Sequence, residues 1–264
     1  MRRKRICIIT GSRAEYGLIY WLIKEVKADQ DLELQLIVTG MHLSSEYGST
    51  YKEIEKDFKI RKKIDINLVS DTSVGISRSM GIAQTSFSQA FKELKPDLLV
   101  LTGDRYETFS AASSAMISKI PIAHIHGGER SEGSMDEGIR HSITKLSHIH
   151  FVSTKIYKKR VLQLGENKKY IFNVGSLGAE AINKIKFINK KELQGLLKIN
   201  FLKKIILISF HPETLEKKLN ERNLNNFLTT LNTLKDYTMI FTMPNADIGF
   251  NLVYKKINKF VKKK

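Results

Sequence analysis

Short apolar runs alternate with stretches of helical periodicity along most of the chain. Several apolar runs contain hardly any polar residue, as in Leu98-Leu99-Val100-Leu101, which is typical of strands covered on both faces. Strand-like runs occupy residues 5–10, 32–39, 97–102, 121–126, 148–153, 204–210 and 237–242. The helical pattern occupies residues 16–27, 74–94, 106–118, 136–146, 155–164, 219–234 and 247–262. This alternation predicts an α/β fold with mostly parallel, doubly wound sheets.

The alternation is interrupted once, between residues 165 and 177, where the segment Gly-Glu-Asn-Lys-Lys begins at Gly165. We place a domain boundary there, which gives an N-terminal domain at 1–172 and a C-terminal domain at 173–264. The first domain has enough strands for a complete Rossmann-like sheet. The second shows only two evident strand–helix units after Ile199, too few for a well-covered parallel sheet, so we expect it to be incomplete.

The net charge of +17 resides mainly in the last part of the chain. Residues 151–264 carry 23 Lys and Arg against 8 Asp and Glu, whereas residues 101–150 are nearly neutral and hold five of the seven histidines. The excess lysines are scattered over predicted helix faces and lack the clustered arginines and aromatics of nucleic-acid binders. We therefore expect a solvated basic surface, no nucleic-acid partner, and chemistry in the middle of the chain.

The apolar content points to a cytoplasmic protein. No run of about 18 uncharged apolar residues occurs, so we expect no membrane span. The basic start at residues 2–5 resembles a signal peptide, but the following apolar run is short and ends in a polar turn, which favours a first strand. The single cysteine, Cys7, lies inside that run and allows no intramolecular disulfide, as suits a reducing compartment.

The turn after the first strand is a candidate anion site. Small residues at 10–17 join that strand to a helix, so amides at the helix start could hold an anion and Arg13 could add a bidentate phosphate contact. An ordinary strand–helix turn remains the competing interpretation.

Acidic residues follow two later strands, where open α/β sheets form their ligand crevice. Asp104 ends a buried strand, although it could instead cap the next helix. Glu129 follows the paired glycines of His-Gly-Gly-Glu, and Asp136, Arg140 and His141 gather near the start of another helix. Three carboxylates on neighbouring loops favour proton transfer. No histidine pair has the spacing of metal ligands, so we expect no metal site.

Two polar segments follow the strands of the second domain. His211 comes directly after one strand and Asn245 after the next. His211 could be a capping or packed histidine, or it could bind a ligand across a cleft.

Together these motifs resemble the hydrolysing UDP-N-acetylglucosamine 2-epimerases of bacterial sialic-acid biosynthesis. The resemblance covers nearly the whole chain in order and spacing. The matching segments are GSRAEYG at 11–17, TGMHL at 39–43, GDRYE at 103–107, HGGE at 126–129, IRHSITK at 139–145, NVGSLGAE at 173–180, FHPET at 210–214 and Asn-Ala-Asp at 245–247. The resemblance implies two Rossmann-like domains of the glycosyltransferase-B type, and a homo-oligomer, dimer or tetramer.

The resemblance also implies a chemistry. The family removes the C2 proton of UDP-N-acetylglucosamine, expels UDP to give 2-acetamidoglucal, and hydrates it to N-acetylmannosamine without a metal or redox cofactor. The implied catalytic residues are Asp104, Glu129, Asp136, Arg140 and His141. The implied substrate-binding residues are Arg13, Gly17, His42, Arg105, His211 and Asn245.

The end of the sequence departs from the family pattern. Family members continue with Gly-Asn-Ser-Ser-Ser-Gly and Gly-Asp-Arg-Gln segments that grip the nucleotide, and neither follows Phe250 here. We therefore expect a C-terminally truncated member with impaired turnover. The alternatives are a UDP-N,N'-diacetylbacillosamine 2-epimerase of legionaminic-acid biosynthesis and a non-catalytic remnant that keeps the first domain as a dimerisation or regulatory module. A basic nucleic-acid binder has the weakest support.

Overall fold

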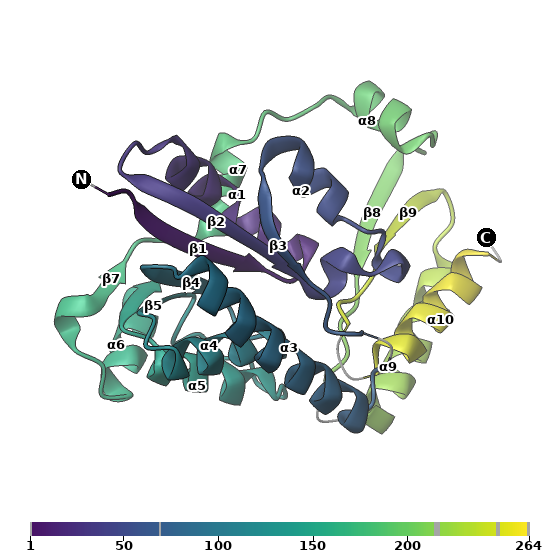
Figure 1. Ribbon diagram of the computed structural model, residues 1–264. Coiled ribbons are helices and arrows are strands. Elements are labelled where there is room, and N and C mark those ends of the chain that lie inside the picture. The colour runs from purple at the N-terminus through teal and green to yellow at the C-terminus, as the bar shows by residue number, and fades with distance from the viewer. Residues whose placement is uncertain (1, 69, 214–216, 247–248, 263–264) are drawn as a thin grey trace. The chain divides into compact units, whose positions relative to one another are not determined.

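The computed structural model describes residues 2–68, 70–213, 217–246 and 249–262. The chain divides into two compact units, Met1–Asn183 and Lys184–Lys264 (Figure 1). No helix within the described ranges is long and apolar enough to cross a membrane. Thr214 and Asp247, which belong to the sequence motifs, lie outside the described residues.

The first unit is built on a seven-stranded sheet in which every neighbouring pair is parallel. The strand order is β3-β2-β1-β4-β5-β6-β7. The strands are β1 (Lys4–Thr10), β2 (Leu32–Thr39), β3 (Ile60–Ile64), β4 (Leu98–Thr102), β5 (Ile122–Ile125), β6 (Ile149–Val152) and β7 (Ile171–Asn173). The predicted α/β class and parallel sheet are confirmed. The order reverses direction at β1, so the carboxyl ends of β1 and β4 flank the topological switch point.

Helices cover both faces of this sheet, which explains why its strands are almost uniformly apolar. Their bounds are α1 (Arg13–Ala28), α2 (Tyr51–Asp57), α3 (Ser73–Leu94), α4 (Tyr106–Ile117), α5 (Asp136–Leu146), α6 (Lys155–Gln163) and α7 (Leu177–Lys184). In Figure 1, α3, α4 and α5 gather on one face, and α1 lies on the other. Ile19 and Ile23 of α1 pack with Ile8, Leu36 and Val100 of the sheet, all buried.

Three short 3-10 helices complete the first unit. They are η1 (Gly40–Leu43), η2 (Ser45–Tyr47) and η3 (Lys168–Tyr170). The predicted boundary at residue 172 falls inside β7, which pairs with β6. Leu177 of α7 packs against the core that contains α1. The first unit therefore continues to Asn183.

The second unit holds a two-stranded parallel sheet of β8 (Lys204–Ser209) and β9 (Tyr237–Thr242). Its helices are α8 (Lys190–Leu197), α9 (Lys217–Thr233) and α10 (Phe250–Val261). Ile208 packs with Leu224 of α9 and Val253 of α10 in the core of this unit. The residues next to Ile208 along β8 point away from this core, and the Leu207 side chain is 70% exposed. One face of the small sheet is thus covered by helices and the other exposes apolar side chains.

Candidate active site at the carboxyl edge of the sheet

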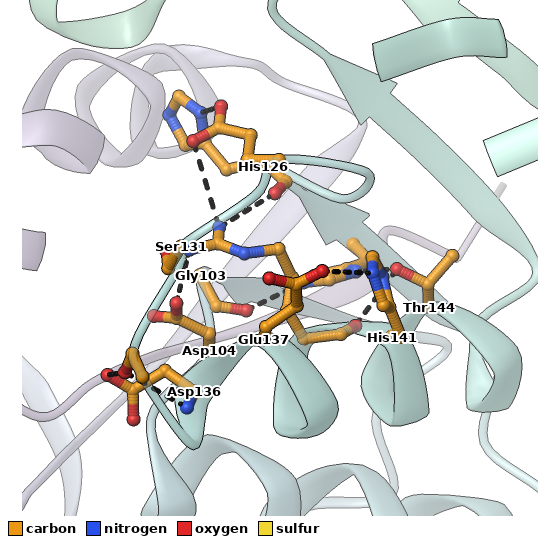
Figure 2. Close-up of polar contacts among 12 residues, drawn as sticks. Gly103, Asp104, His126, Ser131, Asp136, Glu137, His141 and Thr144 are labelled. Carbon is orange, nitrogen blue, oxygen red and sulfur yellow. Dashed lines mark hydrogen bonds and ion pairs between the residues drawn. The ribbon is translucent and has the colours of Figure 1, made fainter. Parts of the chain in front are cut away.

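Arg140 of α5 joins the ends of two strands of the first unit (Figure 2). Its side chain is 8% exposed, and one Nη2 hydrogen bond goes to the Asp104 carboxylate. Nη1 donates to the carbonyl of His126 at 3.0 Å and lies 3.7 Å from Glu129 Oε2. The guanidinium therefore holds two of the three predicted carboxylates, Asp104 and Glu129, in one cluster.

Asp104 is positioned by the backbone of the preceding residue. Gly103 adopts a left-handed conformation with φ +74° directly after β4. Its amide donates to the carbonyl of Ile125 at 3.0 Å, and its carbonyl lies 2.8 Å from His124 Nε2. Because a carbonyl can only accept, His124 carries its proton on Nε2. Burial, partly opposed by the Gly103 contact, lowers the pKa of His124 to about 3, so this ring is neutral. Its contact with the Gly103 carbonyl connects the end of β4 to β5.

The turn that precedes Glu129 requires a glycine at position 128. Gly128 has φ +77°, and a Cβ there would lie 2.6 Å from the carbonyl oxygen of Tyr157 in α6. Glu129 Oε1 accepts hydrogen bonds from His126 Nδ1 at 2.6 Å and Ser153 Oγ at 2.9 Å. Burial alone would raise the pKa of Glu129, but these two donors and the nearby guanidinium outweigh it and lower the pKa below its ordinary value. Glu129 is therefore an ionised carboxylate.

The third predicted carboxylate, Asp136, is the first residue of α5 and is half-buried. Its Oδ2 accepts from Ser134 Oγ at 2.7 Å, and its own amide donates to the same hydroxyl at 3.1 Å. His141, one residue beyond Arg140, turns to another side of the helix. Its Nε2 lies 3.6 Å from Glu137, and its ring lines a groove between α4 and α5 of about 530 Å³. The Asp136 carboxylate is thus fixed at the start of α5 by Ser134, while His141 faces the groove.

The turn after β1 has a different electrostatic character from the one predicted. Glu15 Oε2 accepts from the amides of Gly11 at 2.8 Å and Ser12 at 3.1 Å, in a capping box with Ser12. The backbone amides expected to hold an anion therefore already hold a carboxylate of the chain itself. Arg13 is exposed at the start of α1, and Gly17 is exposed with open space where a Cβ would lie.

A buried ion pair lies beside that turn. Arg105 Nε donates to Glu107 Oε1 at 2.7 Å, and the Glu107 side chain is only 1% exposed. A Cβ on Gly11 would lie 2.6 Å from Glu107 Oε1, so glycine is required for this close approach. Burial and the charge of Glu107, partly opposed by Arg105 and the two amides, raise the pKa of Glu15 to about 7. Two acidic groups and one arginine thus lie close together at the switch point.

His42 of η1 is fully buried. Its Nε2 lies 3.0 Å from Thr10 Oγ1 and its Nδ1 lies 2.7 Å from Thr50 Oγ1. Burial, partly opposed by a contact to the Ser12 backbone, lowers the pKa of His42 to about 4. The ring is therefore neutral, and its two contacts connect the end of β1 to the segment after β2.

In the second unit, His211 and Asn245 follow β8 and β9, whose last residues, Ser209 and Thr242, are register partners. The two side chains therefore belong to the same edge of the small sheet. His211 is exposed and its Nε2 lies 3.1 Å from Ser209 Oγ, while Asn245 is half-buried. Within the described part of the chain, no group of three or more His, Cys, Asp or Glu side chains is arranged to hold a metal ion.

The sequence did not single out His126, Ser153 or Glu107 as site residues. His126 opens the HGGE motif, in which Glu129 is the predicted site residue, and Ser153 has no motif around it. Glu107 carried a signal, since it lies within the GDRYE motif two residues after Arg105. The Ser12–Glu15 spacing was a readable capping-box signature as well.

A doubly wound parallel sheet with carboxylates and arginines beyond its strand ends defines an open α/β protein, a class in which ligands generally bind at the switch point. The chain belongs to the UDP-N-acetylglucosamine 2-epimerase family, whose model matches residues 24–264. This confirms the family indicated by the motifs.

Two curated relatives are similar over the whole chain. A Campylobacter jejuni protein described as GDP/UDP-N,N'-diacetylbacillosamine 2-epimerase (hydrolyzing) is 47% identical over 263 residues, covering 100% of this chain and 68% of its own length. The polysialic acid biosynthesis protein P7 of Escherichia coli is 41% identical, covering 98% of this chain and 66% of its own. The chain thus spans about two thirds of the length of these relatives.

A solved structure shares the fold. The Methanocaldococcus jannaschii UDP-GlcNAc 2-epimerase, in complex with UDP-GlcNAc and UDP, aligns with a TM-score of 0.77 at 21% identity. The alignment covers 98% of this chain and 70% of that structure. At this identity the likeness shows the fold, which agrees with the predicted glycosyltransferase-B type.

Proposed function

We propose that the chain acts as a hydrolysing 2-epimerase on a UDP-linked N-acetyl amino sugar, with UDP-N-acetylglucosamine converted to N-acetylmannosamine and UDP. Family membership and relatives described as hydrolysing 2-epimerases support this reaction class. The observation that carries the proposal is the Arg140 cluster, which gathers Asp104 and Glu129 at the sheet edge where a substrate would bind.

The chemistry has two stages. A base takes the C2 proton, the C2–H electron pair forms the C1=C2 double bond, and the C1–O bond breaks with its electron pair leaving on UDP. Water then adds to the 2-acetamidoglucal. Its oxygen bonds to C1, and C2 receives a proton on the face opposite the one that lost the original proton. The two stages are redox-neutral overall, so no external oxidant or reductant enters the balance. Asp104 follows β4, while Glu129 and Asp136 lie between the end of β5 and the start of α5, and we assign these three carboxylates to the acid–base steps.

We assign nucleotide binding to residues that follow strand ends in each unit. Arg13 and Arg105 lie beyond β1 and β4, and we assign them to the diphosphate, with Gly17 leaving room on α1. His211 and Asn245 share one edge of the second unit and would contact the nucleotide from that unit.

UDP-N,N'-diacetylbacillosamine is the second candidate substrate. The 47% identical Campylobacter jejuni relative is described as acting on this sugar, bound to GDP or UDP. Both candidate sugars carry an N-acetyl group at C2, so the elimination and hydration steps are the same for each. Comparing the rates of UDP release from the two sugar nucleotides at equal concentration decides which sugar the chain prefers.

The test is UDP release in heavy water from each of the two UDP sugars. We expect the epimerised product to carry deuterium at C2, because the original C2 hydrogen is lost in the first stage. Asp104→Asn, Glu129→Gln and Asp136→Asn should each lower turnover by about 10²–10⁴-fold while UDP binding persists. Glu132→Gln, on the same loop but 76% exposed, is the matched control and should keep wild-type turnover.

Two results would redirect the proposal. A product that keeps its C2 hydrogen excludes the elimination route. Binding of UDP without any release from either UDP sugar favours a non-catalytic role for the chain.

A further inference from the structure

His126 has a backbone conformation that histidine rarely adopts. Its φ is +66°, in the left-handed region that favours glycine. The backbone is held from both sides, because its amide donates to the Phe151 carbonyl at 3.0 Å and its own carbonyl accepts from Arg140 at 3.0 Å. Strained backbone fixed by its surroundings is common at functional sites. Here it places the imidazole Nδ1 2.6 Å from Glu129 Oε1, and the His126 ring is labelled in Figure 2.

Glu129 determines which ring nitrogen of His126 carries the proton. An ionised carboxylate has no proton to give, so Nδ1, at 2.6 Å from Oε1, must be the donor. Ser153 Oγ donates to the same oxygen at 2.9 Å and fixes the carboxylate. Arg140 of α5 and His124 of β5 also lie near the pair, and Arg160 of α6 donates to the Gly128 carbonyl beside Glu129. In the neutral form of the ring, the proton on Nδ1 leaves a lone pair on Nε2.

That lone pair has no partner in the structure. Among the described residues, none donates to or accepts from His126 Nε2, although the atom is buried. Buried polar atoms without partners are few in native proteins, and each calls for an explanation. The side chain as a whole is 13% exposed, so part of it lies at the protein surface.

This arrangement is that of a histidine base oriented by a carboxylate, in which one nitrogen is held by the acid and the other is left for the substrate. We propose that His126 and Glu129 form a dyad in which His126 Nε2 exchanges the proton at C2 of the sugar and Glu129 is the positioning residue. The inference rests on the proposed function and changes the role of Glu129 within it.

The dyad removes the proton from one face of the sugar ring. Nε2 takes the C2 proton while the C2–H electron pair forms the double bond and the C1–O pair leaves on UDP. In hydration, a second acid at Asp104 or Asp136 gives its proton to C2 from the opposite face, and the water oxygen bonds to C1. The water proton restores that acid, and the imidazolium returns its proton to solvent.

The tautomer is the first test, and it uses the 264-residue chain without any substrate. Nitrogen NMR of protein labelled at histidine should show, at pH 8, a protonated Nδ1 and a bare Nε2 for His126. His126→Asn assigns the signal, because asparagine tolerates the left-handed backbone and can still donate to Glu129. His124 is an internal reference with the opposite tautomer, since its Nε2 must donate to Gly103. A proton on Nε2 of His126 would overturn the dyad.

The second test is chemical rescue. His126→Gly suits the positive φ and leaves a space for imidazole. We expect UDP release to fall by about 10²–10⁴-fold and to rise again with added imidazole. His148→Gly is the matched control, because its Nδ1 only accepts from the Ile122 amide at 3.2 Å, and imidazole should not change its rate.

Unchanged UDP release by His126→Gly, or a loss that imidazole does not relieve, overturns the inference while leaving the proposed function intact. If the wild-type chain releases UDP from neither sugar nucleotide, the proposed function fails instead. The tautomer measurement then still tests whether Glu129 holds the proton of His126 on Nδ1.

Discussion

Arg140 and Asp104 form an ion pair across 36 residues of sequence, between the start of α5 and the end of β4. The arginine is nearly buried and the aspartate is about one fifth exposed, so removing either partner leaves a poorly solvated charge. The pair also sets the geometry of the site, because the same guanidinium holds the His126 carbonyl.

The first prediction concerns this pair. Arg140→Met should destabilise the protein more than Asp104→Asn, because the arginine also binds His126 and lies close to Glu129. A double-mutant cycle on the free energy of unfolding in urea should give a coupling of about 1–3 kcal/mol between Arg140 and Asp104. Additive effects of the two substitutions would show that the ion pair contributes nothing to stability.

The second prediction concerns two glycines near the site. Gly128→Ala places a Cβ 2.6 Å from the Tyr157 carbonyl at φ +77°, so we expect a loss of more than about 1 kcal/mol and displacement of Glu129. Gly138 lies inside α5 with open space at its Cβ position, so Gly138→Ala should stabilise by about 0.5–1 kcal/mol. Thermal unfolding measures both. Equal effects at the two positions would contradict the steric argument.

The strands and their carboxyl ends were predictable because a doubly covered parallel sheet leaves nearly uniform apolar runs. Two edge strands escaped this pattern. In β3, Ile60 and Ile64 enclose Arg61, Lys62 and Lys63, a polar segment typical of a sheet edge, and β7 has only three residues. Neither strand forms the continuous apolar run that marks the central ones.

The candidate site was predictable only in part. The positions of Asp104 and Glu129 followed from strand ends, which local sequence reveals. The ion pair of Asp104 with Arg140 depends on how α5 packs, and the His126 contact depends on a backbone angle that histidine seldom adopts. Such relationships exist only in the folded chain.

The third prediction concerns the exposed apolar face of the second unit. Leu207 is 70% exposed and its neighbour Ile208 is 3% exposed, so the two residues point to opposite faces of β8. Leu207→Thr should reduce concentration-dependent self-association in light scattering and leave stability nearly unchanged. Ile208→Thr should instead destabilise this unit, by about 1–3 kcal/mol, because it buries a hydroxyl in place of apolar atoms. Self-association that Leu207→Thr does not alter would exclude this face as its cause.

The last prediction concerns the pH dependence that Glu15 gives to stability. Its pKa is raised to about 7 in the folded protein by burial and by Glu107, from an ordinary value of 4.5. Between these two values the folded state binds more protons than the unfolded state, so the free energy of unfolding falls as pH rises. The contribution of Glu15 is therefore fully present below about pH 4.5 and is lost as pH rises through about 7. Its size is on the order of 1–3 kcal/mol.

Glu15→Gln isolates this effect, since the amide oxygen can still accept from Gly11 and Ser12 but cannot ionise. The difference in free energy of unfolding between wild type and Glu15→Gln should therefore shift in favour of the variant as pH rises from 4.5 to 7. Glu25→Gln, an exposed change on the same helix, controls for the loss of one surface charge. A difference between wild type and Glu15→Gln that stays constant across this pH range would mean that Glu15 is already ionised, with Arg105 and the two amides outweighing its burial.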